Sequence, residues 1–85
     1  MKTKELFSEI VNRGYKAEIV SMFSYSINKD KRFRMISVLD IPTPELFSLV
    51  DSYNAYLRVS ILNRGEDKVV TYDVYPKNST DFDFE

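Results

Sequence analysis

The sequence predicts a single α+β domain, in which two helices cover one face of a four-stranded, mainly antiparallel sheet, in the order α-β-β-α-β-β. Three observations lead to this fold class. Two stretches place apolar residues at helical spacing, four others alternate with period two, and a Glu-Leu-Phe-Ser motif occurs twice, at residues 5–8 and 45–48. The length of 85 residues fits one hydrophobic core and one domain, 1–85.

The repeated motif indicates a duplication. Each copy is followed by an apolar helical stretch, an alternating stretch, a turn and a second alternating stretch. This common order predicts an internal (αββ)2 arrangement with repeats at 3–41 and 43–76. The acidic tail at 77–85 is expected to be a flexible terminus.

The first helix is expected over residues 3–13, and Gly14 follows it as a left-handed C-cap. The second helix begins with Thr43 as N-cap and Pro44 at the first helical position, and Asn54 is expected to end it. The predicted inward-facing residues of the two helices are Leu6, Phe7, Ile10 and Val11, then Leu46, Phe47, Val50 and Tyr53.

The remaining segments are interpreted as strands joined by polar turns at 28–31 and 63–67, with Gly65 at a positive φ in the second turn. The predicted strands cover residues 16–27, 32–41, 55–62 and 68–75. In the second strand, Phe33 and Met35 are placed toward the helices, which directs Ile36 and Val38 outward.

The face of the sheet away from the helices is predicted to be unusually apolar for a solitary protein. Its large apolar or aromatic residues are expected to be Val20, Met22, Ile36, Val38, Tyr56, Leu62, Val69 and Tyr75. An exposed patch of this kind usually marks an interface, although a curved sheet or the tail offers a purely structural cover. The predicted partner-binding residues are Met22, Arg34, Ile36, Val38, Tyr56, Arg58 and Tyr75. On this placement, Val38→Glu leaves the fold intact and abolishes association.

The composition argues against an enzyme. The chain has no histidine and no cysteine, so the usual general base near neutral pH, the commonest metal ligands and thiol chemistry are all missing. No serine lies in a nucleophile elbow, and no carboxylates have a calcium-loop spacing. We therefore expect no catalytic residue, no metal site and no cofactor.

A basic cluster near the first turn supports an alternative function. Lys29, Lys31, Arg32 and Arg34 surround one aromatic residue, a pattern that can hold phosphates and stack on bases. The net charge of −1 and the lack of a glycine-rich phosphate loop favour a solvated hairpin end instead. The charge is uneven along the chain, because residues 1–34 have eight Lys/Arg against four Asp/Glu, and residues 35–85 have four against nine.

The polar N-terminus and the absence of a bilayer-length apolar run predict a cytoplasmic protein without membrane partners. In size, in its lack of catalytic residues and in its Lys/Asn/Ser/Ile-rich composition, the chain resembles the small accessory proteins of phages and mobile elements, among them the anti-CRISPR inhibitors. This resemblance implies binding to a larger protein.

We therefore expect a small non-enzymatic protein-binding module, an inhibitor or adaptor, with homodimerisation as its simplest form. The alternatives are a nucleic-acid-binding domain using the basic hairpin and the sheet face, and a structural subunit of a larger assembly.

Overall fold

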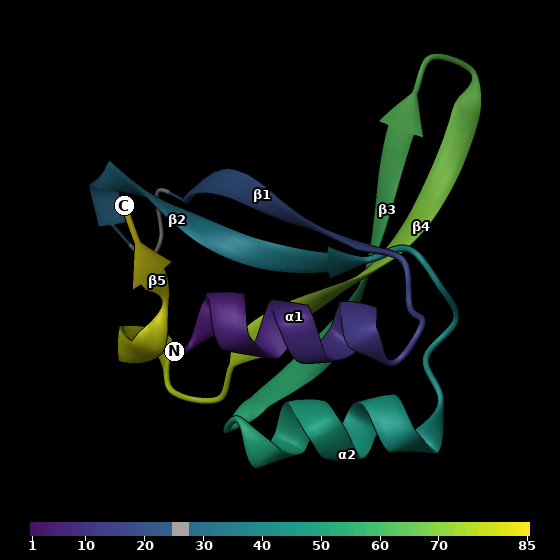
Figure 1. The fold of residues 1–85 in the computed structure, drawn as a ribbon. Helices are drawn as coiled ribbons and strands as arrows, with labels where there is room; N and C mark the ends of the chain where they lie inside the picture. The colour runs from purple at the N-terminus through teal and green to yellow at the C-terminus, as the bar shows by residue number, and fades with distance from the viewer. Residues whose placement is uncertain (25–27) are drawn as a thin grey trace.

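The computed structural model describes residues 1–24 and 28–85, with the backbone alone for residue 24 and residues 28–30. Two helices, α1 (Thr3–Asn12) and α2 (Pro44–Ser52), lie on one side of a five-stranded antiparallel sheet (Figure 1). The strands are β1 (Ala17–Ser24), β2 (Asn28–Val38), β3 (Ala55–Arg64), β4 (Asp67–Pro76) and β5 (Asp83–Phe84). Their order is β1-β2-β4-β3, and β5 pairs with β2. The predicted α+β sandwich is confirmed, and β5 is an addition to it.

The helix ends follow the sequence signals. Thr43 accepts a hydrogen bond from the backbone N–H of Leu46 at 3.3 Å, which caps α2. Asn54, with φ of 56°, turns the chain out of α2 into β3, and Gly14, with φ of 94°, follows α1. Both conformations are left-handed, a region that Gly and Asn occupy more readily than other residues.

The apolar stripe of α2 differs from the predicted one. Phe47 was expected to face the core, but 53% of it is exposed. Leu49, which was not expected there, is buried together with Leu46 and Val50. The three buried positions form the i, i+3, i+4 pattern of a single helix face, and Phe47 lies beside this face rather than on it.

The predicted direction of the β2 side chains is wrong. Ala17 pairs with Val38, and Ile19 pairs with Ile36, so the even-numbered residues of β2 share the helix-facing side with the odd-numbered residues of β1. Ile36 and Val38 are fully buried in the core beneath the helices. The strand also starts earlier than predicted, at Asn28, where a turn was expected. A shift of one residue in the pairing of a strand moves each of its side chains to the opposite face of the sheet. This shift explains why all the β2 side chains were placed on the wrong face.

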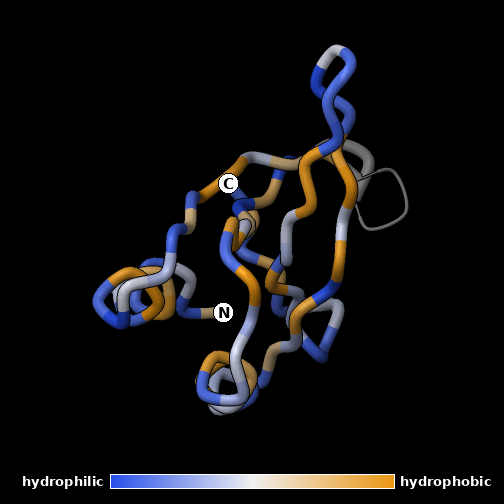
Figure 2. The backbone as a smooth tube through the Cα atoms, turned by 90° about the vertical axis from the view of Figure 1, so that its right-hand side faces the viewer, coloured by the Kyte–Doolittle hydropathy of each residue, from blue (hydrophilic) through white to orange (hydrophobic). Residues whose placement is uncertain are grey.

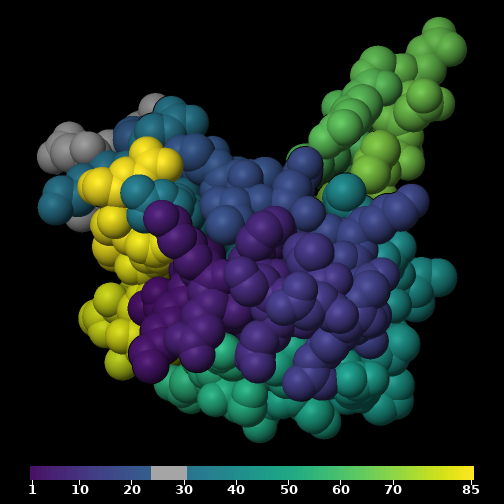
Figure 3. Space-filling model, in the orientation of Figure 1, coloured from purple at the N-terminus to yellow at the C-terminus, as the bar shows by residue number. Residues whose placement is uncertain are grey.

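The two hairpins of the sheet meet only briefly. β2 and β4 share two residue pairs, Ser37 with Asp73 and Val38 with Tyr72, after which the strands diverge (Figure 1). The far part of the β3–β4 hairpin, residues 59–71, then projects away from the body of the molecule (Figure 3). We call this part the arm. Its tip is hydrophilic, but apolar residues lie on the strands behind the tip (Figure 2).

The tail is not a frayed end in this structure. Residues 79–81 form a 3-10 turn, and β5 then pairs with β2 through Phe33 opposite Phe84 and Arg34 opposite Asp83. β5 therefore occupies the edge of β2 that β4 leaves when the hairpins diverge. The tail lies on the same side of β2 as β4 and extends the sheet there.

The order of the elements preserves the predicted repeat. Both halves are α-β-β, and the strand order β1-β2-β4-β3 places the halves on either side of the β2–β4 junction. Such an arrangement is what an approximate two-fold relation between two copies would produce. The duplication itself stays a prediction.

Candidate functional site

A shallow groove lies on the outer face of the sheet, by which we mean the face opposite the helices. The diverging hairpins form its two walls, and its volume is about 110 Å³. Its lining residues are Glu18, Val20, Met22, Met35, Ser37, Ser60, Leu62, Arg64, Thr71 and Asp73. The groove therefore has apolar side chains on both walls, with Glu18 and Arg64 as charged wall residues, and polar side chains where the hairpins meet.

The floor of the groove contains a buried carboxylate. Asp73 is 7% exposed, and its Oδ1 accepts hydrogen bonds from Ser37 Oγ at 3.0 Å and from Thr71 Oγ1 at 3.3 Å. Ser37 belongs to β2, whereas Thr71 and Asp73 belong to β4. The pairing therefore bridges the junction, and the two donors satisfy an acceptor oxygen that would otherwise be costly to bury.

An aromatic cluster lies beside the groove, and the tail completes it. Phe82 meets Phe33 edge-on at 4.7 Å between ring centroids and meets Tyr75 at 6.0 Å. Phe84 adds a further contact to Phe33 at 6.3 Å. Phe33 is consequently only 4% exposed on a face that no helix covers. The tail thus covers this part of the outer face, as expected from the alternative in which the tail, and not a partner, covers the apolar residues.

Tyr75 connects the aromatic cluster to the charged residues. Its ring stacks on Tyr56 at 5.9 Å, and the guanidinium carbon of Arg58 lies 5.5 Å from its centroid, within cation–π range. Burial raises the pKa of the Tyr75 phenol, and the charge of Asp73 raises it further, while Arg58 opposes both. The phenol therefore stays protonated and neutral at physiological pH.

The structure separates the predicted partner-binding residues into two groups. Tyr56, Arg58 and Tyr75 lie together on the outer face, and Met22 lies on the groove wall formed by β1. Ile36 and Val38 lie on the opposite side, within the core, because of the register of β2.

Arg34 shares the side of β2 that carries Ile36 and Val38, and its guanidinium pairs with Asp83 at 3.3 Å. Its placement on the outer face was therefore wrong as well. Burial leaves Ile36 and Val38 no surface to offer a partner, and Val38→Glu would place a charge in the core rather than test an interface.

The basic cluster is partly neutralised by the tail. Besides the Arg34–Asp83 pair, Arg32 Nε donates to Ser21 Oγ at 3.0 Å, and Ser21 Oγ donates to Glu85 at 2.9 Å. Lys31 is exposed, whereas the side chain of Lys29 lies outside the described residues. The acidic end of the chain thus lies against the basic residues that would otherwise face a phosphate.

Sequence reasoning missed Phe33, Met35 and Ser37 as outer-face residues, and it missed the cover formed by Phe82 and Phe84. A signal for the tail was present. The alternating Asp83-Phe84-Glu85 complements Arg32-Phe33-Arg34 in charge and in aromatic position when the two segments run antiparallel.

Among the side chains that the structure describes, those of residues 1–23 and 31–85, no cluster suited to a metal ion is present. In the same part of the chain, no helix has the length and apolar character required to cross a bilayer. Comparison with protein families, with curated proteins and with solved structures found no match to this chain. The site must therefore be interpreted from its own chemistry.

Proposed function

We propose that this chain is a small non-enzymatic protein-binding module, an inhibitor or adaptor, and that the groove on the outer face receives a segment of a larger protein. The observation that carries the proposal is the combination of apolar walls with a polar floor. Val20, Met22 and Leu62 offer apolar contact, and the carboxylate of Asp73 is held in a fixed orientation between them. Concave sites of this composition are typical binding sites.

The chemistry of the groove suggests what the partner segment presents. Apolar side chains would contact the walls, and a hydrogen-bond donor, such as a backbone N–H or a basic side chain, would point toward Asp73. Arg58 and Tyr75 would form the rim next to the groove. Tyr and Arg are enriched among residues that contribute most to protein–protein binding.

The test compares two exposed apolar residues. Met22, on the groove wall, is 39% exposed, and Val11, on α1, is 43% exposed. A tagged chain is used to capture partners from source-cell lysate with and without nuclease, as wild type, Met22→Glu and Val11→Glu. A stoichiometric protein that survives nuclease, is lost with Met22→Glu and is retained with Val11→Glu supports the proposal.

Two outcomes contradict it. Partners that disappear after nuclease, with binding that weakens steeply as salt rises, would indicate nucleic-acid binding through the basic residues. Equal capture by both variants would show that the groove is not the binding site. Circular dichroism of each variant checks that the fold is retained.

A further inference from the structure

β3 is an open sheet edge of unusual composition. Among the described residues it pairs with β4 alone. The exposed apolar side chains on this strand are Tyr56 at 43%, Val59 at 60%, Ile61 at 61% and Leu62 at 42%. The strand contains no proline, and its only charges are Arg58 and Arg64. Natural proteins normally protect such an edge, because its unpaired backbone groups can extend the sheet with another strand.

The hairpin turn determines which backbone groups of β3 point to the open edge. Arg64 pairs with Asp67 across a two-residue turn in which Gly65 has φ of 64°, as a type II′ turn requires. In such a hairpin the closing pair exchanges hydrogen bonds, and bonded positions alternate from there. Residues 57, 59, 61 and 63 therefore direct their N–H and C=O groups away from β4. Pro76 opposite Ala55 agrees with this alternation, because a position without bonds to β3 needs no N–H.

We propose that a second copy of this chain pairs with β3 along this edge, antiparallel, about a two-fold axis through Val59. A two-fold axis perpendicular to the sheet leaves the helices of both copies on the same side of the combined sheet. Each helix-facing residue of β3 therefore lies opposite a helix-facing residue of the second copy. Val59 then lies opposite Val59 of the second copy, and Leu57 lies opposite its Ile61. On the outer face, Tyr56 lies opposite Leu62 of the second copy, and Arg58 lies opposite its Ser60.

The charges of β3 favour this register over its neighbours. An axis through Arg58 would place Arg58 opposite itself, and an axis through Ile61 would place Arg58 opposite Arg64. An axis through Ser60 would place Arg58 opposite Leu62 and Arg64 opposite Tyr56. Like charges directly opposite each other destabilise a sheet, and apolar pairs stabilise it, so the axis through Val59 is the best of the four.

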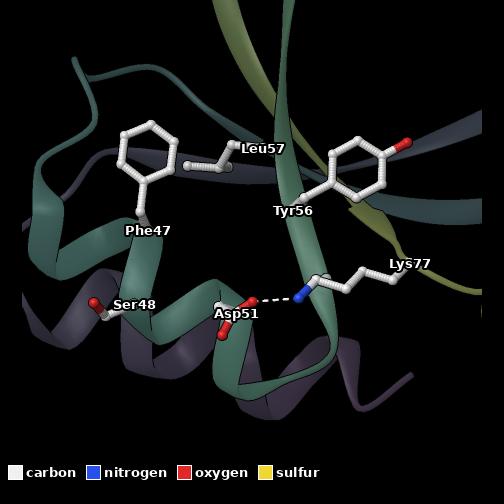
Figure 4. A pocket seen from close by; sticks show the side chains of 7 residues that line it. Phe47, Ser48, Asp51, Tyr56, Leu57 and Lys77 are labelled. Atoms are coloured by element: carbon white, nitrogen blue, oxygen red, sulfur yellow. Dashed lines mark hydrogen bonds and ion pairs between the residues drawn. The ribbon is translucent and has the colours of Figure 1, made fainter.

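A pocket on the same edge provides the second argument. It lies between α2 and β3, has a volume of about 420 Å³, and has Phe47 and Leu57 on one side and the ion pair of Asp51 with Lys77 on another (Figure 4). In the proposed register, Ile61 of the second copy lies opposite Leu57 on the helix-facing side, so its side chain enters this pocket next to Phe47. One occupant thus accounts for the pocket and for the exposed Phe47.

The register places Arg64 of the second copy opposite Asn54, at the C-terminal end of α2. The arm of each copy would then rest against the body of the other.

The first experiment measures the oligomeric state of the full chain by analytical ultracentrifugation, from micromolar to millimolar concentration. Val59→Lys is compared with Val70→Lys, which lies on the same face of the arm, 45% exposed, but on β4 and not at the edge. We expect a wild-type dimer, a dissociation constant raised at least about a hundredfold by Val59→Lys, and little change with Val70→Lys. A monomeric wild type, or equal effects of both variants, would overturn the proposal.

The second experiment tests the register and does not depend on the first variant folding well. The chain has no cysteine, so a single Cys can be introduced. In the proposed dimer the two Val59 Cα atoms would be about 5.5 Å apart, within disulfide range, so Val59→Cys should form a covalent dimer under mild oxidation. The two Ser60 Cα atoms would be about 8 Å apart, so Ser60→Cys should not.

Cross-linking of Ser60→Cys in preference to Val59→Cys would refute this register. The dimer does not depend on the groove as a binding site, and Met22→Glu should leave the sedimentation unchanged. Failure of either proposal can therefore be recognised separately.

Discussion

The two hairpins of this protein have similar sequence patterns but different surroundings. β1 and β2 have α1 on one face, and β5 and the aromatic residues of the tail lie against β2. β3 and β4 form ten residue pairs, yet only their proximal half packs beneath α2, and Val59, Ile61 and Val70 on the arm remain about half exposed or more. Regular pairing therefore does not determine burial. What decides it is whether a third element packs against the hairpin.

The largest difference between the hairpins should appear on introducing a charge. Val38→Glu, in β2, places an unpaired carboxylate in the core and should cost about 3–5 kcal/mol, enough to unfold much of a small domain. Val70→Glu, on the arm, should change the free energy of unfolding by less than about 1 kcal/mol. Urea denaturation followed by circular dichroism measures both values. A Val38→Glu variant as stable as wild type would contradict the burial described here.

The second prediction concerns the aromatic side chains of the tail, which cover the first hairpin but not the arm. Phe82→Ala removes the ring that contacts Phe33 and Tyr75, and should cost about 1–3 kcal/mol. Phe47→Ala, at an exposed position, is the control and should cost less than about 1 kcal/mol in the monomer. Thermal unfolding at low protein concentration compares the two. Equal losses would mean that the tail does not stabilise the first hairpin.

These contrasts show what a sequence can and cannot predict here. The helices, the helix caps at Thr43 and Gly14 and the fold class were predicted correctly, because these signals are local. The direction of the β2 side chains was predicted wrongly, because this strand has large apolar residues at both odd and even positions. Phe33 and Met35 are at odd positions, and Ile36 and Val38 are at even positions. When both faces of a strand become buried, alternation carries no information on which one faces the helices.

The outer face was predicted in part for the same reason. Met22, Tyr56, Arg58 and Tyr75 were placed correctly on the outer face. The groove itself depends on how far the two hairpins diverge, which no local pattern encodes. The role of the tail was hidden for another reason, since its complement in β2 is about fifty residues away in the sequence.

The third prediction concerns the junction that joins the hairpins. Ser37→Ala removes a hydrogen bond to the buried Asp73 and should cost about 1–2 kcal/mol. Ser60→Ala, in β3 on the same outer face, should remain within about 0.5 kcal/mol of wild type. Chemical denaturation distinguishes the two. If Ser60→Ala proves the more damaging, the bond across the junction is not the important one.

The smallest expected effect on stability concerns a hydrogen bond between the two helices. Tyr53, at the end of α2, donates a hydrogen bond to Glu9 of α1 at 2.5 Å, and this bond, with lesser contributions from desolvation and Glu5, raises the pKa of the phenol well above its usual value of 10.0. The folded state thus holds the phenolic proton more tightly than the unfolded state. This stabilisation is present below pH 10 and declines as the pH rises further.

Tyr53→Phe should therefore lower the thermal midpoint slightly below pH 10 and reduce its decline above that pH. Tyr15→Phe offers a control in which a different contact, to Thr43, is removed. Calorimetry across this pH range measures both. An identical alkaline decline in wild type and Tyr53→Phe would show that the bond to Glu9 does not contribute.

The brief junction between β2 and β4 also has a consequence for folding kinetics. Each hairpin connects strands adjacent in the sequence, and such hairpins form within about 1–10 μs, whereas the junction requires residues 37–38 to meet residues 72–73. We expect each αββ half to form before the folding transition state, and the two halves to dock after it. Weakening the junction, as Ser37→Ala does, should then accelerate unfolding while leaving the refolding rate almost unchanged.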